Sequence, residues 1–384
     1  MKITNDIVYV GVNDRELDLF EAHFTVPNGM AYNSYVILDD KIAVMDSVAE
    51  GFGDEWLKKL AEATGGRAPD YLIVQHMEPD HSANIAAFAA LYPDAVIVSS
   101  SRSFTMMKNF YGDDFAGRRI EAADGKPLSL GRHTLRFISA PMVHWPEVTM
   151  TFDETDRVLF SADAFGKFGT LDTDEDWACE ARRYYFGIVG KFGGQVARVL
   201  DRIEGLGVTA ICPLHGPYIT DNIGYYTGLY RIWSSYGVES EGVTIAYTSV
   251  YGHTKKVAER LAEVLKEKGC PKVAMQDLVR DDTAEAVEDA FRYGKLVLAT
   301  TTYYGDIFPP MKEFIDHLVF RGYKGRRIGF IENGSWFPQA AGVMKKLLAD
   351  CKDIDYCKTA VRIVSAPDAG TEAQIEALAD ELLG

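Results

Sequence analysis

The sequence lacks any pair of cysteines in a C-x-x-C spacing. Its five cysteines are scattered and odd in number: Cys179, Cys212, Cys270, Cys351 and Cys357. This usage argues against a disulfide-stapled scaffold, and against a rubredoxin or iron–sulfur module within the chain.

Long apolar runs and positive charge are also scarce. No uninterrupted apolar stretch approaches membrane-spanning length, and Met1 to Asp6 lack the apolar core of a signal peptide. The 40 Lys and Arg residues are outnumbered by 56 Asp and Glu residues, giving a net charge of −16. That balance argues against nucleic acid or an anionic membrane as a partner. The sequence therefore predicts a cytoplasmic protein.

What is present fits two folded domains. The chain has 384 residues, 47% of them hydrophobic and 25% charged, which is ordinary for globular proteins and long enough for two cores. Ser234 to Gly242 is short, polar and rich in glycine and serine. We expect it to link a first domain, residues 1–240, to a second domain, residues 241–384.

The first domain is predicted to be an α/β sandwich. Alternating apolar and polar residues predict strands and helical periodicity predicts helices. Strands are expected at residues 34–38, 41–45, 71–74, 95–98, 134–138, 158–160 and 208–212, and helices at 54–64, 82–91 and 177–203.

The second domain is predicted to be a regular alternation of strands and helices. Strands are expected at residues 243–247, 272–275, 296–300, 328–331 and 360–364, and helices at 254–268, 284–291, 311–320, 340–349 and 372–383. Five strands alternating with five helices predict a doubly wound parallel sheet, which binds ligands outside the carboxyl ends of its strands.

Four residues able to bind a metal crowd into six positions after the strand at 71–74. They are His76, Glu78, Asp80 and His81, with Pro79 stiffening the turn between them. One ion seldom takes four ligands from so short a loop, so the spacing indicates two ions. A lone histidine here would more often be a core residue; four ligands together favour metal.

The stretch resembles the H-x-H-x-D-H signature of the metallo-β-lactamase superfamily, with Glu78 in place of its second histidine. That replacement is the pattern of the flavodiiron proteins (A-type flavoproteins). Mixed imidazole and carboxylate ligands suit iron, whereas imidazole-rich sites suit zinc hydrolysis. The family's remaining ligands match His144, Asp163 and His215, each of which follows a short apolar stretch.

The first strand–helix turn of the second domain predicts an anion cradle. It combines hydroxyls with a glycine before a helix: Thr248, Ser249, Val250, Tyr251, Gly252, His253 and Thr254. It lacks the lysine of a nucleoside triphosphate loop and the G-x-G-x-x-G of a dinucleotide site. It resembles the FMN-phosphate loop of flavodoxins, whose flavin is clamped at two further strand ends. The matching residues are Thr302, Tyr303, Tyr304, Gly305, Asp306, Asn333, Gly334, Ser335 and Trp336.

The resemblance covers essentially the whole chain and implies both architecture and chemistry. It implies a metallo-β-lactamase-like αββα sandwich followed by a flavodoxin-like, five-stranded parallel sheet. One iron would be held by His76, Glu78 and His144, the other by Asp80, His81 and His215, with Asp163 bridging them. The family reduces dioxygen to water, nitric oxide to nitrous oxide, or both. Two ferrous ions and a reduced FMN hold the four electrons that dioxygen needs.

The resemblance also implies partners. The family forms head-to-tail homodimers in which each flavin faces the partner's irons, with a dimer of dimers as a larger form. No donor module follows Gly384, so we expect a separate electron donor, a rubredoxin or a reduced deazaflavin. Around the irons, Trp145 is expected to wall the pocket, and Tyr184 or Tyr185 to offer a hydroxyl to the substrate.

Two alternatives remain open from the sequence. The chain could be a metal-dependent hydrolase of the metallo-β-lactamase superfamily with a fused flavodoxin-like redox module, although Glu78 counts against it. It could also be an electron carrier whose first domain is structural, although seven spaced ligands count against that. Metal analysis with an absorption spectrum separates the three hypotheses.

Overall fold

The computed structural model describes all 384 residues and divides into two compact units, Met1–Arg231 and Ile232–Gly384. The division falls inside helix α7 (Ile223–Ser234), just ahead of the polar stretch that the sequence analysis treated as a linker. The functional boundary at residue 240 stays a prediction.

The first unit contains two mixed sheets. The first sheet has the order β1 (Ile7–Tyr9), β6 (Tyr35–Ile37), β7 (Ala43–Met45), β8 (Tyr71–Ile73), β9 (Val96–Ser99) and β10 (Arg119–Glu121). The second has the order β11 (Leu128–Ser129), β12 (Thr134–Ser139), β13 (Thr149–Asp153), β14 (Val158–Phe160) and β15 (Ala210–Cys212). Two short ribbons pair β2 (Val12–Asp14) with β5 (Met30–Tyr32), and β3 (Leu19–Phe20) with β4 (Phe24–Thr25).

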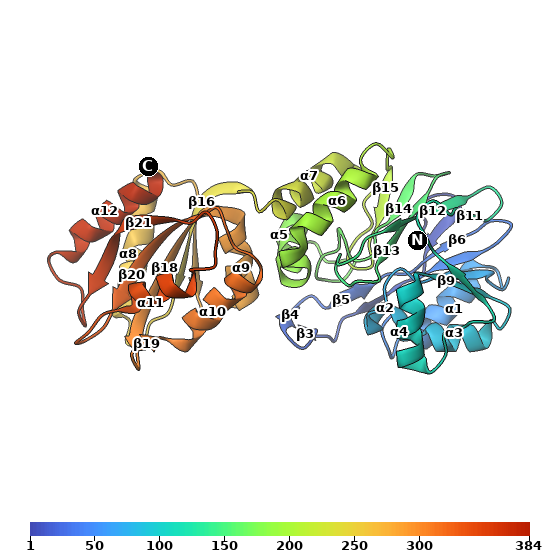
Figure 1. Ribbon diagram of the computed structural model, residues 1–384, viewed down its shortest axis with the longest axis horizontal. Helices are drawn as coiled ribbons and strands as arrows, with labels where there is room; N and C mark the ends of the chain where they lie inside the picture. Colours follow the sequence, from blue (N-terminus) through green and yellow to red (C-terminus); the bar gives the residue numbers. More distant parts are fainter. The chain divides into compact units, whose positions relative to one another are not determined.

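The two sheets pack face to face around one apolar core. Tyr35 and Ile73 from the first sheet meet Phe137 and Phe160 from the second in a single buried cluster. Helices α1 (Gly53–Ala63), α3 (Ile85–Leu91) and α4 (Ser101–Tyr111) lie beside the first sheet (Figure 1). Helices α6 (Gly193–Ile203) and α7 border the second sheet, and residues of both helices line one cavity with residues of β14 and β15. The predicted αββα sandwich is confirmed.

The single long helix predicted for residues 177–203 is wrong. The structure has α5 (Trp177–Tyr184), a π-helical turn η1 (Tyr185–Val189), a 3₁₀ turn η2 (Gly190–Phe192) and then α6. Glycine explains the break, since it weakens a helix and permits close packing. A Cβ on Gly187 would come within 2.8 Å of the Phe24 ring, so only glycine fits against that ring. Helices α4 and α7 were not predicted.

The second unit is a five-stranded parallel sheet. Its order is β17 (Val273–Asp277), β16 (Ser240–Tyr247), β18 (Tyr293–Tyr303), β20 (Arg327–Asn333) and β21 (Asp355–Ile363), and a short β19 (Asp306–Ile307) pairs antiparallel with β18. The helices are α8 (His253–Glu267), α9 (Thr283–Arg292), α10 (Pro309–Phe320), α11 (Ala340–Leu347) and α12 (Thr371–Leu383). The predicted alternation is confirmed.

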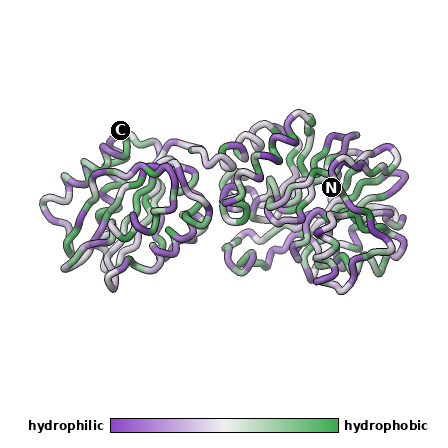
Figure 2. The backbone as a smooth tube through the Cα atoms, viewed as in Figure 1, coloured by the Kyte–Doolittle hydropathy of each residue, from purple (hydrophilic) through white to green (hydrophobic).

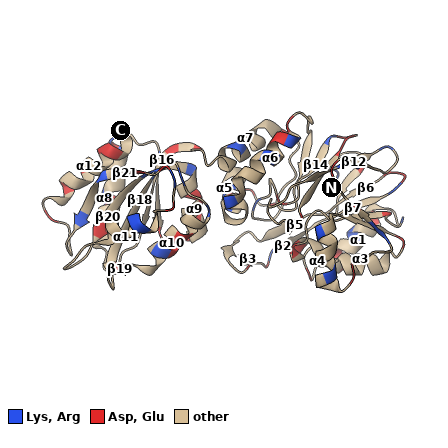
Figure 3. Ribbon diagram, in the orientation of Figure 1, with Lys and Arg blue, Asp and Glu red and all other residues tan.

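The strand order of this sheet places a ligand crevice. The chain passes from β16 to β17 on one side of it, and then crosses to β18, β20 and β21 on its other side. The direction in which strands are added to the sheet therefore reverses at β16. In such sheets ligands bind beyond the carboxyl ends of the strands at the reversal. The apolar stretches lie along the strands (Figure 2), and Lys, Arg, Asp and Glu are concentrated on helices and connecting segments (Figure 3). No helix is long and apolar enough to cross a membrane.

Candidate functional site

The loop after β8 is held in place by a buried carboxylate. Asp46 Oδ1 accepts a 2.7 Å hydrogen bond from the Gln75 backbone N–H, and its Oδ2 accepts a 2.9 Å bond from Gln75 Nε2. Burial raises the pKa of Asp46 to about 7, although these hydrogen bonds oppose that shift. The loop then delivers His76 and Glu78, and the single-turn helix α2 (Pro79–Ser82) delivers Asp80 and His81.

Three further strand ends bring the remaining predicted ligands to the same edge. His144 lies between β12 and β13, Asp163 follows β14, and His215 follows β15. Within each of two groups, the ligand atoms lie within 4.8 Å of one another. The first group is His76, Glu78, His144 and Asp163, and the second group is Asp80, His81 and His215.

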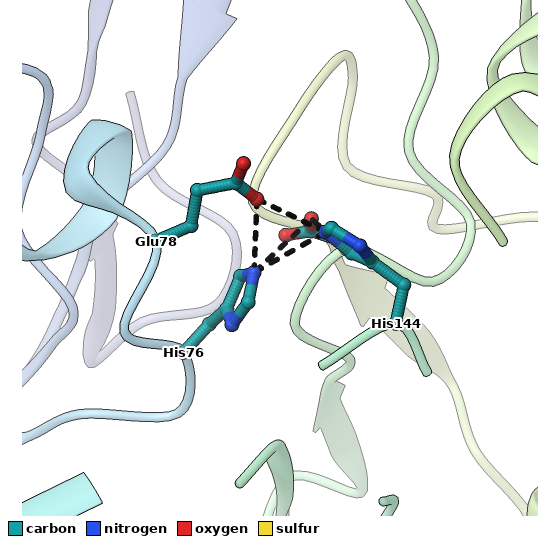
Figure 4. Close-up of side chains that lie close together, drawn as sticks. His76, Glu78 and His144 are labelled. Carbon is teal, nitrogen blue, oxygen red and sulfur yellow. Dashed lines mark hydrogen bonds and ion pairs between the residues drawn. The ribbon is translucent and has the colours of Figure 1, made fainter. Parts of the chain in front are cut away.

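The first group converges on a small volume. His144 Nε2 lies 3.0 Å from Glu78 Oε2 and 3.1 Å from Asp163 Oδ2. His76 Nε2 lies 3.2 Å from the same Glu78 oxygen and 3.3 Å from His144 Nε2. Figure 4 shows His76, Glu78 and His144 pointing toward one another.

The second group has a similar geometry. His81 Nε2 and His215 Nε2 lie 3.0 Å apart, and each is 3.3 Å from Asp80 Oδ2. Asp163 reaches this group too, because its Oδ1 lies 3.4 Å from His81 Nε2 while its Oδ2 faces the first group. One carboxylate therefore lies between both groups.

The hydrogen bonds of two histidines orient their inner ring nitrogens for a cation. His76 Nδ1 faces a carboxylate oxygen of Glu147 at 2.8 Å, and His215 Nδ1 faces the Ala31 carbonyl at 2.8 Å. Each Nδ1 carries a hydrogen, because the oxygen that it faces is an acceptor, and each Nε2 is turned inward towards Glu78 or Asp80. Although burial opposes the shift, nearby carboxylates raise the pKa of both rings, so a metal ion bound here would replace the proton on Nε2.

The charges lead to the same conclusion. Glu78, Asp80, Asp163 and Glu147 place four carboxylates around four imidazoles at a largely buried site. Both Asp80 oxygens, Asp163 Oδ1 and His81 Nδ1 are buried without a hydrogen-bond partner. Although burial alone would raise it, the charge on His76 and the hydrogen bond from His144 hold the pKa of Asp163 well below its ordinary value. Burial lowers the pKa of His81 to about 4, which keeps its imidazole neutral. The donor set fits two divalent cations.

The aromatic residues expected near the metals take different places. The Tyr184 hydroxyl donates a 2.9 Å hydrogen bond to Asp163 Oδ2. The Trp145 ring stands edge-on to the His76 ring with centroids 5.2 Å apart, so it covers that ligand. Tyr185 is fully buried, and its ring packs against Phe186 and Tyr230.

Sequence reasoning missed two acidic residues at this site. Glu147, which hydrogen bonds to His76, follows His144 by three positions, but nothing in the ligand spacing marks it. Glu21, on the β3–β4 hairpin, approaches Glu78 from a distant part of the sequence. Partial burial and the negative charge of Glu78 raise the pKa of Glu21 to about 7.

The second unit has a pocket of about 510 Å³ at the predicted crevice. Thirteen predicted residues line it: Ser249, Val250, Tyr251, His253, Thr254, Thr302, Tyr303, Tyr304, Gly305, Asn333, Gly334, Ser335 and Trp336. No Asp, Glu, Lys or Arg lines the pocket, and hydroxyls are plentiful. It opens at the N-terminus of α8, where Gly252 has a φ of 90°, a left-handed conformation that favours glycine. An aromatic-walled pocket with a neutral anion cradle fits FMN.

Three predicted residues do not line this pocket, and four unpredicted ones do. Thr248 is buried beneath the cradle, and its hydroxyl is hydrogen bonded to the Thr300 hydroxyl at 2.6 Å. Gly252 is the N-cap residue of α8. Asp306 pairs with Lys312 at 2.8 Å and lines a neighbouring groove. The additional lining residues are Thr301, Phe337, Gln339 and Ser365. Ser365 follows β21, the strand end that the sequence argument did not use.

Comparison with known proteins agrees with both units. The family model described as ODP family beta lactamase matches residues 30–216, and the flavodoxin domain model matches residues 244–329. A relative from Moorella thermoacetica named nitric oxide reductase is 31% identical over 328 residues, covering 83% of this chain and 81% of the relative. The chain belongs to the flavodiiron protein family. As a flavodiiron protein it is an oxidoreductase whose cofactors are FMN and a non-haem diiron centre.

Solved structures share the fold of this flavodiiron chain. The rubredoxin oxygen:oxidoreductase of Desulfovibrio gigas aligns with a TM-score of 0.91 at 23% identity, over 100% of this chain and 97% of that one. The flavodiiron protein of Giardia intestinalis aligns with a TM-score of 0.91 at 23% identity, over 99% and 96%. The individual ligand and flavin-binding assignments stay predictions.

Proposed function

We propose that this flavodiiron chain reduces dioxygen to water, nitric oxide to nitrous oxide, or both, with electrons delivered through FMN. The observation that carries the proposal is the pair of ligand groups sharing Asp163. In the proposed assignment one iron is held by His76, Glu78 and His144, the other by Asp80, His81 and His215, with Asp163 between them. Two ferrous ions and a reduced flavin together supply the four electrons that dioxygen requires.

The side chains around the metals have separate tasks in this proposal. The carboxylates of Glu78, Asp80 and Asp163 balance the positive charge of the ions. The hydroxyl of Tyr184, hydrogen bonded to Asp163 Oδ2 at 2.9 Å, fixes the direction of that carboxylate. The Trp145 ring covers His76 and limits access of water to that side of the site. In this proposal neither Tyr184 nor Tyr185 contacts the bound dioxygen or nitric oxide.

Metal analysis and an absorption spectrum test the proposal together with gas consumption. We expect roughly two irons per chain, because a mixed set of imidazole and carboxylate ligands suits iron. We also expect a yellow flavin spectrum. The reduced protein should consume dioxygen or nitric oxide in stopped-flow reoxidation, and the faster gas identifies the preferred substrate. Zinc with hydrolytic turnover would instead support the hydrolase, and flavin without metal the electron carrier.

We further propose that the chain acts as a head-to-tail homodimer, each flavin serving the partner's irons. The mouth of the flavin pocket supports this, because three of its rings are almost fully exposed. Tyr251 is 91% exposed, Tyr304 94% and Trp336 90%. An aromatic cluster of this kind marks a ligand or protein contact more often than a bare surface.

A mixed dimer tests the direction of electron transfer. Asp163→Ala removes the shared metal ligand, and Ser249→Asp places a negative charge where the FMN phosphate would bind. Neither variant alone should consume gas. When the two are co-assembled, the flavin of the first serves the irons of the second, and activity should return to a sizeable fraction of the wild-type value. Inactive mixed dimers would contradict the head-to-tail arrangement, as would a fully active monomer at high dilution.

The electron donor is proposed to be a separate carrier. A small rubredoxin and a reduced deazaflavin are the two candidates. Steady-state reduction of the FMN by each purified donor distinguishes them. The cytoplasmic location stays a prediction, and fractionation of cells would test it.

A further inference from the structure

Glu147 lies in the loop between β12 and β13, and its side chain is fully buried. Its Oε1 accepts two hydrogen bonds, from His76 Nδ1 at 2.8 Å and from the Met77 backbone N–H at 2.9 Å. Its other oxygen, Oε2, is buried without a hydrogen-bond partner. The carboxylate therefore hydrogen bonds to the metal-binding loop, and no Lys or Arg forms an ion pair with it.

The second ligand group has no equivalent carboxylate. His215 Nδ1 donates to the backbone carbonyl of Ala31 at 2.8 Å, and His81 Nδ1 is buried without a partner. A carboxylate behind a ligand imidazole fixes its tautomer and ring direction and makes its other nitrogen a stronger donor. A carbonyl fixes the tautomer but adds no negative charge. The two groups thus differ in the hydrogen-bond acceptor of the outer imidazole nitrogen, a carboxylate in the first and a carbonyl in the second.

We propose that Glu147 is a positioning residue that makes the two metal subsites unequal. It directs His76 Nε2 into the first group and adds a buried negative charge beside that group alone. The first subsite therefore binds its ion more tightly, and its iron is harder to reduce than the iron of the second subsite. The inference rests on the proposed diiron function and extends it to an order in which the two ions are bound and reduced.

Two substitutions separate orientation from charge. In Glu147→Gln, the amide oxygen can still accept from both His76 Nδ1 and Met77 N–H, so the ring direction is kept and only the charge is lost. In Glu147→Ala both acceptors disappear and the ring is free to turn. The first variant reports on the reduction potential and the second on metal affinity.

The same unit contains a matched control. Asp153 accepts a 2.9 Å hydrogen bond from His133 Nδ1, and both side chains are fully buried. This pair stands outside the two ligand groups, and the guanidinium of Arg132, 2.6 Å from His133 Nε2, supplies positive charge beside it. Asp153→Asn thus disturbs a buried histidine–carboxylate pair without touching a proposed ligand.

The decisive measurements are metal retention and redox titration, neither of which needs gas turnover. After dialysis against a chelator that leaves the wild type loaded, Glu147→Ala should have lost the first ion, its affinity lowered about 10–100-fold. Glu147→Gln should keep both irons, but one of its two reduction steps, followed by EPR, should move to a higher potential. Asp153→Asn should match the wild type in both.

Any of three results would overturn the inference. The first is wild-type affinity for both ions in Glu147→Ala, and the second is unchanged potentials in Glu147→Gln. An equal loss of metal in Asp153→Asn would overturn it too, because the effect would then come from general loosening of the fold. A zinc-loaded wild type would defeat the proposed function separately, and loss of one zinc in Glu147→Ala would still support the orienting role.

Discussion

The hydroxyl of Tyr184 hydrogen bonds at 2.9 Å to Oδ2 of Asp163, the carboxylate that both ligand groups share. Both side chains are buried, so the bond has no competition from water. Hydrogen bonds to charged groups contribute about 1.5–3 kcal/mol. We therefore expect Tyr184→Phe to lower the free energy of unfolding by roughly that amount and to weaken iron binding about tenfold or more.

Denaturant titration and iron retention measure these two effects. Tyr185→Phe is the matched control, because Tyr185 is equally buried but packs on Phe186 and Tyr230. It should retain iron as the wild type does. Equal iron loss in both variants would show that burial of the hydroxyls, not the contact with Asp163, is what matters.

Single ligand substitutions should remove ions one group at a time. His144 contacts only the first group and His215 only the second, whereas Asp163 contacts both. We expect His144→Ala and His215→Ala each to retain about one iron per chain, because each removes a donor from one group and leaves the other group intact. Asp163→Ala should retain less than either and should abolish gas consumption. Elemental analysis of the purified variants checks the order, and full iron retention in Asp163→Ala would contradict the shared-ligand assignment.

The metal-free protein should lose stability as the pH rises. Although burial opposes it, hydrogen bonds to Asp163 and Glu78 raise the pKa of His144 from 6.5 to about 9. Because the folded state holds this proton more tightly than the unfolded state, the stabilisation is complete below pH 6.5 and is lost as the pH rises through about 9. The Tm of the apoprotein should therefore fall across that window.

His144→Gln should flatten this contribution, since glutamine does not titrate. In the same window the wild-type apoprotein should take up metal more readily at higher pH, because metal must displace the His144 proton. Calorimetry of the chelator-treated protein and metal titrations at several pH values are the measurements. A Tm in wild-type apoprotein that rises from pH 6.5 to 9 would argue against a protonated His144.

The exposed indole of Trp336 should contribute to flavin binding. It lies at the pocket mouth and is 90% exposed, so it has few protein contacts of its own to lose. Aromatic stacking beyond simple burial is worth about 0.5–1.5 kcal/mol. Trp336→Ala should therefore weaken FMN binding about 2–10-fold with little change in Tm. Fluorescence titration of the flavin-free protein measures this.

Phe320→Ala serves as the comparison. Phe320 is 66% exposed and lies in the neighbouring groove rather than in the flavin pocket. FMN affinity should be unchanged in this variant. If both substitutions weakened FMN binding alike, the effect of Trp336 would have to be attributed to the surface of the unit rather than to stacking.

Local sequence patterns made much of the fold predictable, but they did not predict the helix break at Gly187. Apolar stretches located the strands of the second unit, and helical periodicity located all five of its helices. The break after Tyr184 was not predicted, because Gly187 is tolerated in a helical pattern and only its contact with Phe24 explains why the helix must deviate there. Helix α7 was not predicted; it ends at Ser234, the first residue of the polar stretch interpreted as a linker.

The sequence by itself was enough to predict the ligand types and the cofactor loops, because metal and phosphate recognition depend on residues closely spaced after strand ends. His76 to His81 and Thr248 to Thr254 carry that information locally. Only the tertiary structure decided which groups hydrogen bond to the predicted ligands. Glu147, Tyr184 and the Ala31 carbonyl reach the site from separate segments, and their hydrogen bonds depend on how the two sheets bring those segments together.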